Sequence, residues 1–97
     1  MIMSTYRTQV RIVADVLSCA SHSSLDNRGV GITQILQKAN LSYTRLTHIL
    51  NRLVKSGLLE QIHVNNNNRY IISDKGIQFL QSYSEFAEFA ESFGMKL

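Results

Sequence analysis

The feature that most constrains the fold is a pair of amphipathic segments joined by a short turn. Segments 32–39 and 42–56 repeat apolar side chains at intervals of three and four, which is helical spacing. Ser42 is placed to cap the second segment. Gly57 predicts its end, because glycine takes the left-handed conformation freely. A short helix, a tight turn at Asn40-Leu41 and a longer helix make a helix-turn-helix.

The residues before this unit predict one more helix. Apolar side chains recur at helical steps over residues 5–20, and residues 21–31 are rich in Ser, Asp, Asn and Gly, which is typical of a loop. Thr33 is the predicted N-cap of the helix over 32–39. A helix and a long loop therefore precede the helix-turn-helix.

The residues after Gly57 have the composition of strands. Segments 58–64 and 69–72 are rich in β-branched and aromatic side chains. The asparagines at 65–68 suit a hairpin tip, since asparagine tolerates positive φ. Ser73-Asp74 then caps a last helix over 75–93. The order of elements predicts a mainly α (α+β) fold, a winged helix-turn-helix with a two-stranded wing and an added C-terminal helix.

The chain has the length and balance of one small domain, with 97 residues, 44% of them hydrophobic and 18% charged. We expect residues 1–75 to form the winged helix-turn-helix domain and residues 76–97 to form the added C-terminal helix packed on it. A single cysteine excludes an internal disulfide, which is typical of a reducing compartment. No apolar run approaches the roughly 20 residues of a membrane span. We therefore predict a cytoplasmic, nucleoid-associated protein without a membrane partner.

Charge is unevenly distributed along the chain. The net charge is +3, but residues 1–75 carry nine Lys or Arg against four Asp or Glu, whereas residues 76–97 carry one Lys against three Glu. A basic body followed by an acidic helix permits a nucleic-acid partner for the body without requiring one.

The helix predicted over 42–56 has an outward face suited to DNA. Polar and cationic side chains lie opposite its apolar face, and none of them is acidic. Asparagine can bond adenine through two hydrogen bonds, as arginine can bond guanine. Side chains near the helix start are placed for base edges, and later ones for phosphates. The predicted DNA-binding residues are Tyr43, Thr44, Arg45, Thr47, His48, Asn51, Arg52 and Lys55, with Arg69 on the wing.

A second set of residues is expected at the DNA backbone. It comprises Arg7, Arg11, Ser42, His63, Asn66 and Asn67. Arg7 and Arg11 are equally well explained as solvated charges. Tyr43 lies near the edge of the apolar face, where we expect it to pack between helices. The general alternative is an ordinary solvated helix face; the missing acidic residues and the adjacent hairpin favour DNA.

The last predicted helix carries a broad apolar stripe. The heptad positions are Phe79, Tyr83, Phe86, Ala90 and Phe93, spaced by four and three. Part of the stripe can pack on the first helix and the rest on a second copy, so we predict a homodimer. Two recognition helices would then lie about 34 Å apart, one DNA turn. The alternative is a monomer whose last helix folds wholly onto its own domain.

Three stretches of the sequence resemble a known family. Residues 32–43 contain an Ala-Asn-Leu-Ser-Tyr turn, residues 46–59 end in Gly-Leu-Leu after a Leu-rich helix, and residues 70–80 continue into the last helix. Together they resemble small archaeal winged-helix DNA-binding proteins with a dimerising C-terminal coiled coil, found among transcriptional regulators and chromatin-associated proteins. The resemblance implies that the helix with Tyr43, Thr44, Thr47, His48, Asn51 and Arg52 enters the major groove, and that the wing near Arg69 contacts backbone. Gly94 shortens the last helix, which favours a compact dimer over a long rod.

Residues for other chemistry are not arranged in known patterns. The histidines and Cys19 lack metal-ligand spacing, and neither a glycine-rich phosphate loop nor a paired-carboxylate site is present. We expect no enzyme activity, no metal and no cofactor. The sequence gives no sign of an effector site and leaves a small-molecule effector open. The leading hypothesis is a homodimeric transcriptional regulator on double-stranded DNA. The alternatives are a nucleoid protein with little sequence preference and a winged-helix protein-interaction module.

Overall fold

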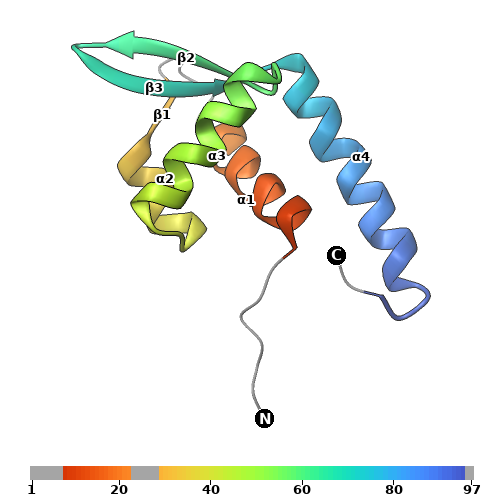
Figure 1. The fold of residues 1–97 in the computed structure, drawn as a ribbon. Helices are drawn as coiled ribbons and strands as arrows, with labels where there is room; N and C mark the ends of the chain where they lie inside the picture. The colour runs from red at the N-terminus through yellow and green to blue at the C-terminus, as the bar shows by residue number, and fades with distance from the viewer. Residues whose placement is uncertain (1–7, 23–28, 96–97) are drawn as a thin grey trace.

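The structure is a computed structural model that describes residues 8–22 and 29–95. Within these ranges the chain forms four helices and three strands (Figure 1). They are α1 (Gln9–His22), β1 (Val30–Gly31), α2 (Ile32–Ala39), α3 (Tyr43–Lys55), β2 (Leu59–Val64), β3 (Asn67–Ile72) and α4 (Asp74–Glu91). The strands form one antiparallel sheet in the order β1-β3-β2. The mainly helical α+β prediction, with a helix-turn-helix followed by a hairpin, is confirmed.

The ends of α3 are set by local sequence. The Ser42 hydroxyl accepts a hydrogen bond from the backbone N–H of Arg45 at 3.2 Å, so Ser42 is the N-cap. At the other end Gly57 has a φ of 85°, and the N–H of Leu58 donates to the carbonyl of Leu53 at 2.9 Å. This is a Schellman motif, which leads the chain straight into β2. Both predicted ends of the helix are confirmed to within one residue.

The start of α2 differs from the prediction of a Thr33 cap. The helix begins at Ile32, directly after β1, and Gly31 occupies the N-cap position. The Gln34 side-chain oxygen accepts a hydrogen bond from the N–H of Gly31 at 3.0 Å. Because β1 fixes Gly31 in extended backbone, the helix starts before Thr33 can act as a cap.

The hairpin turn is tighter than the predicted four-residue tip. Asn65 and Asn66 have φ values of 53° and 65°, and Val64 pairs with Asn67. Two central residues with positive φ make a type I′ turn, whose twist matches that of the strands. Asn67 and Asn68 consequently belong to β3, which starts two residues before the predicted Arg69.

The sheet has a third strand that the sequence did not predict. Val30 pairs with Tyr70, and Gly31 pairs with Arg69, at the end of a segment interpreted as loop. Residues 1–7 and 23–28 lie outside the described residues, and with them Arg7 and most of that predicted loop. The wing is therefore held from one side by the segment that leads into α2.

The hydrophobic core lies between the first three helices and the sheet. Its largest fully buried side chains come from every one of these layers: Val16, Leu17, Ile35, Leu46, Leu50 and Leu59. The apolar face of α3 is therefore turned inward, which leaves its opposite face in solvent. None of the helices in the described part of the chain is both long and apolar enough to pass through a membrane.

The last helix, α4, begins on the domain and then leads away from it (Figure 1). The Ser73 hydroxyl accepts a hydrogen bond from the N–H of Gly76 at 3.1 Å, which caps the helix as predicted. Phe79 and Leu80 pack on the core, and the helix lies beside α1. Gly94, with a φ of 82°, follows the last turn.

Removing the cap of α3 should destabilise the domain without unfolding it. We expect Ser42→Ala to lower the free energy of unfolding by about 1 kcal/mol, because the Arg45 N–H loses its partner. Urea denaturation measures this change. Ser73→Ala is the control for stability. It removes the corresponding cap of α4 and also the hydrogen bond that the Ser73 hydroxyl donates to the Gly57 carbonyl at 2.5 Å, so its loss should be at least as large. If Ser42 also contacts a phosphate, DNA affinity will fall for Ser42→Ala alone; an equal fall for both variants would contradict that contact.

Candidate nucleic-acid interface

The outer face of α3 is polar over its whole length. Leu46, Ile49, Leu50 and Leu53 are buried on the inner face. The exposed residues on the other side are Tyr43, Thr44, Arg45, His48, Asn51, Arg52 and Lys55, with Thr47 half-buried. No acidic residue occurs between Tyr43 and Lys55. The helix therefore offers DNA a continuous surface that does not repel phosphate.

A groove runs between α3, the start of α2 and the hairpin, and we call it the wing groove. Tyr43, Thr47 and Asn51 face it from successive turns of α3. Its remaining lining is Gly31, Ile32, Thr33, Gln34, Gln61, Asn66, Asn67, Asn68, Arg69 and Tyr70. Side-chain amides predominate, and no carboxylate is among the described residues that line it. The predicted recognition helix and the predicted wing thus share one concave surface.

Tyr43 does not pack between helices as expected. Its side chain is 60% exposed and lines the wing groove. Burial, and then the nearby Tyr43 hydroxyl, raise the pKa of Tyr70 above its ordinary value. The Tyr70 hydroxyl is protonated at neutral pH, as that of an ordinary tyrosine is, and can donate a hydrogen bond. Tyr43 is the first residue of α3, and its exposure there differs from what its position on a helical wheel indicated.

Arg69 lies below the wing tip rather than at it. It pairs with Ile62 of β2 and Gly31 of β1, and its Nη2 donates to the carbonyl of Gly29 at 2.8 Å. This hydrogen bond ties the hairpin to the segment that enters α2. Arg69 still lines the wing groove, so its predicted DNA contact stays a prediction.

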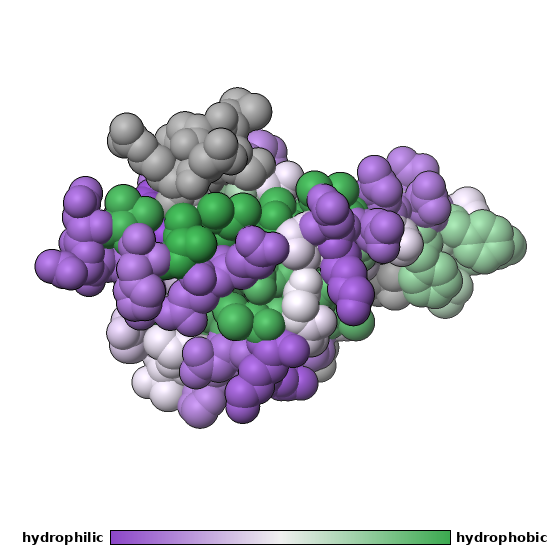
Figure 2. Space-filling model, turned by 90° about the horizontal axis from the view of Figure 1, so that it is seen from above, coloured by the Kyte–Doolittle hydropathy of each residue, from purple (hydrophilic) through white to green (hydrophobic). Residues whose placement is uncertain are grey.

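The wing tip is formed by exposed polar residues. His63 pairs with Asn68 across the hairpin, and Asn66 and Asn67 are exposed beyond it. In the view from above, hydrophilic residues gather at this tip, which lies to the left as in Figure 1 (Figure 2). The tip is thus available to a second macromolecule.

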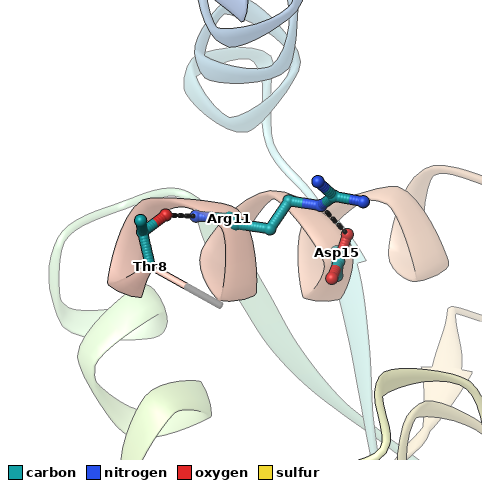
Figure 3. A network of polar contacts seen from close by, with 3 residues as sticks. All are labelled: Thr8, Arg11 and Asp15. Atoms are coloured by element: carbon teal, nitrogen blue, oxygen red, sulfur yellow. Dashed lines mark hydrogen bonds and ion pairs between the residues drawn. The ribbon is translucent and has the colours of Figure 1, made fainter. Parts of the chain in front are cut away.

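Four predicted cationic contacts among the described residues do not line the wing groove: Arg11, Arg45, Arg52 and Lys55. Arg52 lines a small hollow between α1 and α3, together with Gln9 and Val13. Arg11 is on α1, where its Nε donates to Asp15 at 3.3 Å and its backbone N–H donates to the hydroxyl of Thr8 at 3.1 Å (Figure 3). The pair with Asp15 reduces the charge that Arg11 offers to a phosphate.

Sequence reasoning missed several residues that line the wing groove. Gln34 and Thr33 enter it because α2 begins beside the hairpin, and Gln61 pairs with Tyr70 on the sheet. Gln61 could have been found from the alternation of side chains along a strand. It follows the buried Leu59 by two residues and therefore lies on the same face of the sheet as Leu59. For Gln34 no comparable local signal exists.

The far end of α4 exposes large apolar side chains. Of the predicted seam, Phe79 and Tyr83 are half-buried and Ala90 is buried, whereas Phe86 and Phe93 are 56% and 65% exposed. Phe89 packs edge-to-face on Phe93, with ring centroids 5.1 Å apart, and Met95 is also exposed. Figure 2 shows this hydrophobic end of the molecule on the right, opposite the wing tip. Some residues of the predicted seam are thus covered by the chain itself, and the others are exposed to solvent.

The described residues form neither a metal site nor a site with a reactive thiol. No three His, Cys, Asp or Glu side chains there come together as a metal ion requires. Burial raises the pKa of the Cys19 thiol, so this thiol is a poor nucleophile at neutral pH.

Solved structures share this fold. A DNA-binding protein from Sulfolobus solfataricus, Sso10a-2, is 26% identical, with a TM-score of 0.77 over 90% of this chain and 85% of its own. BpsR of Bordetella bronchiseptica, whose DNA binding is regulated by 6-hydroxynicotinic acid, is 17% identical, with a TM-score of 0.65 over 84% of this chain and 56% of its own. SSV1 F-93 is 18% identical, with a TM-score of 0.61 over 95% and 99% of the two chains.

Comparison with curated proteins gives no match. A family model described as winged helix-turn-helix matches residues 6–91, which includes every helix and strand described above. The fold, with its helix-turn-helix of α2 and α3 followed by a hairpin, agrees with that match. The chain therefore belongs to the winged helix-turn-helix family.

Proposed function

We propose that this protein is a transcriptional regulator that binds double-stranded DNA as a homodimer. The observation that carries the proposal is the outer face of α3, which is exposed, lacks acidic residues and adjoins the wing groove. In this arrangement α3 enters the major groove and the hairpin tip reaches the backbone or the minor groove. The similarity to a DNA-binding protein over nearly the whole chain supports it.

The proposed dimer uses the apolar end of α4. Phe86, Phe89, Phe93 and Met95 are all more than half exposed, which is unusual for four large apolar side chains so close together. A second copy of the same helix would cover them, as a two-fold axis requires of an isologous interface. We assign residues 1–75 to DNA binding and residues 76–97 to dimerisation, in a cytoplasmic protein of the archaeal type that the sequence resembles.

The test is selection of duplexes from a random library by the purified protein at near-physiological salt. An enriched inverted repeat, with half-sites about one DNA turn apart, is the expected result. Bound duplexes without a common motif would instead favour the nucleoid protein, which relies on phosphate contacts. Failure to retain any duplex would favour the protein-interaction module and would overturn the proposal.

Removing two polar side chains from α3 should abolish tight binding. We expect Asn51→Ala combined with Arg52→Ala to lower affinity for the selected duplex by about a hundredfold, through one base contact and one phosphate contact. Both residues are exposed, so the fold should persist. Fluorescence anisotropy measures the affinity, and circular dichroism checks the fold. Unchanged affinity in a folded variant would show that α3 does not enter the groove.

A further inference from the structure

The hydrogen-bonding groups of the wing groove are largely neutral amides. Gln34 comes from α2, Asn51 from α3, Gln61 from β2 and Asn66–Asn68 from the wing. We propose that the wing groove selects A·T base pairs, with Asn51 as the residue that reads adenine. This inference rests on the DNA binding proposed above and adds the chemical class of sequence that the site prefers.

An amide matches adenine better than it matches the other bases. In the major groove adenine presents the N7 acceptor beside the N6 donor, and one asparagine can satisfy both. Guanine presents two acceptors, N7 and O6, which an arginine fork satisfies and an asparagine does not. A surface that reads bases through amides therefore favours adenine.

The position of Asn51 suits such a contact. It is exposed and faces the wing groove two helical turns after Tyr43, with Thr47 between them. Gln34 lines the same groove, and its side-chain oxygen accepts a hydrogen bond from the Gly31 N–H at 3.0 Å. The Gln34 amide nitrogen is thereby left as a donor, which suits the O4 acceptor of thymine.

Arg69 is the one guanidinium among the described residues that line the wing groove, and its Nη2 donates to the Gly29 carbonyl at 2.8 Å. Two further arginines of α3, Arg45 and Arg52, do not line the wing groove, and Arg45 is exposed on the outer face of the helix. Arg52 lies on the side of α3 that faces α1. Among its described residues, the wing groove therefore has no guanidinium with both donors directed at the N7 and O6 atoms of a guanine.

The residues of the wing tip also favour A·T base pairs. Its tip presents Asn66, Asn67 and Asn68, which carry amide donors and no charge. In the minor groove A·T pairs expose only acceptors, whereas guanine adds its N2 amino group as a donor and an obstruction. Amide donors at the wing tip therefore suit A·T pairs there too.

The experiment compares three duplexes of equal length by anisotropy: one with A·T-rich half-sites, one with G·C-rich half-sites, and the A·T-rich one with 7-deazaadenine, which lacks N7. We expect the protein to bind the A·T-rich duplex at least about tenfold more tightly than either of the other two. One bidentate contact supplies a difference of this size. Asn51→Ala should weaken binding to the A·T-rich duplex about tenfold, and 7-deazaadenine should then have no further effect. Asn51→Arg should move the preference towards G·C.

Lys55→Ala is the matched control on the same exposed face, because a phosphate contact should weaken binding to all three duplexes equally. Equal affinity of the wild type for the A·T-rich and G·C-rich duplexes would overturn the inference and leave DNA binding intact. An Asn51→Ala variant that still responds to 7-deazaadenine would overturn the assignment to Asn51. Absence of binding to every duplex would overturn the proposed function itself.

Discussion

Replacing Gly76 by alanine should lower the free energy of unfolding by about 2–3 kcal/mol, through overpacking at a buried contact. The same change at an ordinary helix position stabilises a protein, because alanine is the better helix former. Here a Cβ atom would meet the carbonyl oxygen of Leu58 and would lie 2.6 Å from Cγ1 of Ile72. The first turn of α4 would have to move away from the hairpin base. Urea denaturation measures the loss.

Gly94→Ala is the control for this prediction. A Cβ at Gly94 would meet nothing within 4 Å, so the cost is limited to its positive φ of 82°. We expect a loss of about 1 kcal/mol there, from the backbone conformation alone. A Gly76→Ala variant as stable as the wild type would show that α4 does not approach the hairpin base as closely as described.

Placing serine at both Phe86 and Phe93 should convert the proposed dimer into a monomer and lower DNA affinity about a hundredfold or more. Each ring is more than half exposed, and its full burial is worth about 1.5–3 kcal/mol. Without the dimer, the second recognition helix loses the high effective concentration that linkage to the first provides. Analytical ultracentrifugation gives the mass, and anisotropy on the selected inverted repeat gives the affinity.

The matched control replaces two exposed polar residues of the same helix, Gln78 and Gln81, by serine. This variant should remain dimeric with unchanged DNA affinity. A wild type that sediments as a monomer would contradict the dimer outright. A Phe86→Ser and Phe93→Ser variant that remains dimeric would place the interface elsewhere.

The parts of the fold that could be predicted are those determined by neighbouring residues. The caps at Ser42 and Ser73 and the helix end at Gly57 depend on contacts within a few positions of the chain, which the sequence displays directly. The strand β1 could not be predicted, because a two-residue strand has no periodicity and exists only through its pairing with β3. The two-residue turn at Asn65-Asn66 lay hidden in a run of four identical residues.

In the candidate site, too, one part could be predicted from neighbouring residues and another could not. The polar face of α3 followed from its helical period, whereas the wing groove depends on how α2 and the hairpin are packed around it. Tyr43 illustrates the difference, since its wheel position suggested packing and its neighbours leave it 60% exposed. Gln34 and Gln61 became part of the site only through these long-range contacts.

The third strand makes the wing and the helix-turn-helix a single mechanical unit. Because β1 pairs with β3 and runs into α2 without an intervening residue, a tilt of the hairpin must also move the start of α2. The Arg69–Gly29 hydrogen bond stiffens the same joint. Such a domain meets its ligand already ordered, so association costs little conformational entropy. A distortion imposed at the wing by bent DNA would pass to the recognition surface instead of being absorbed by a hinge.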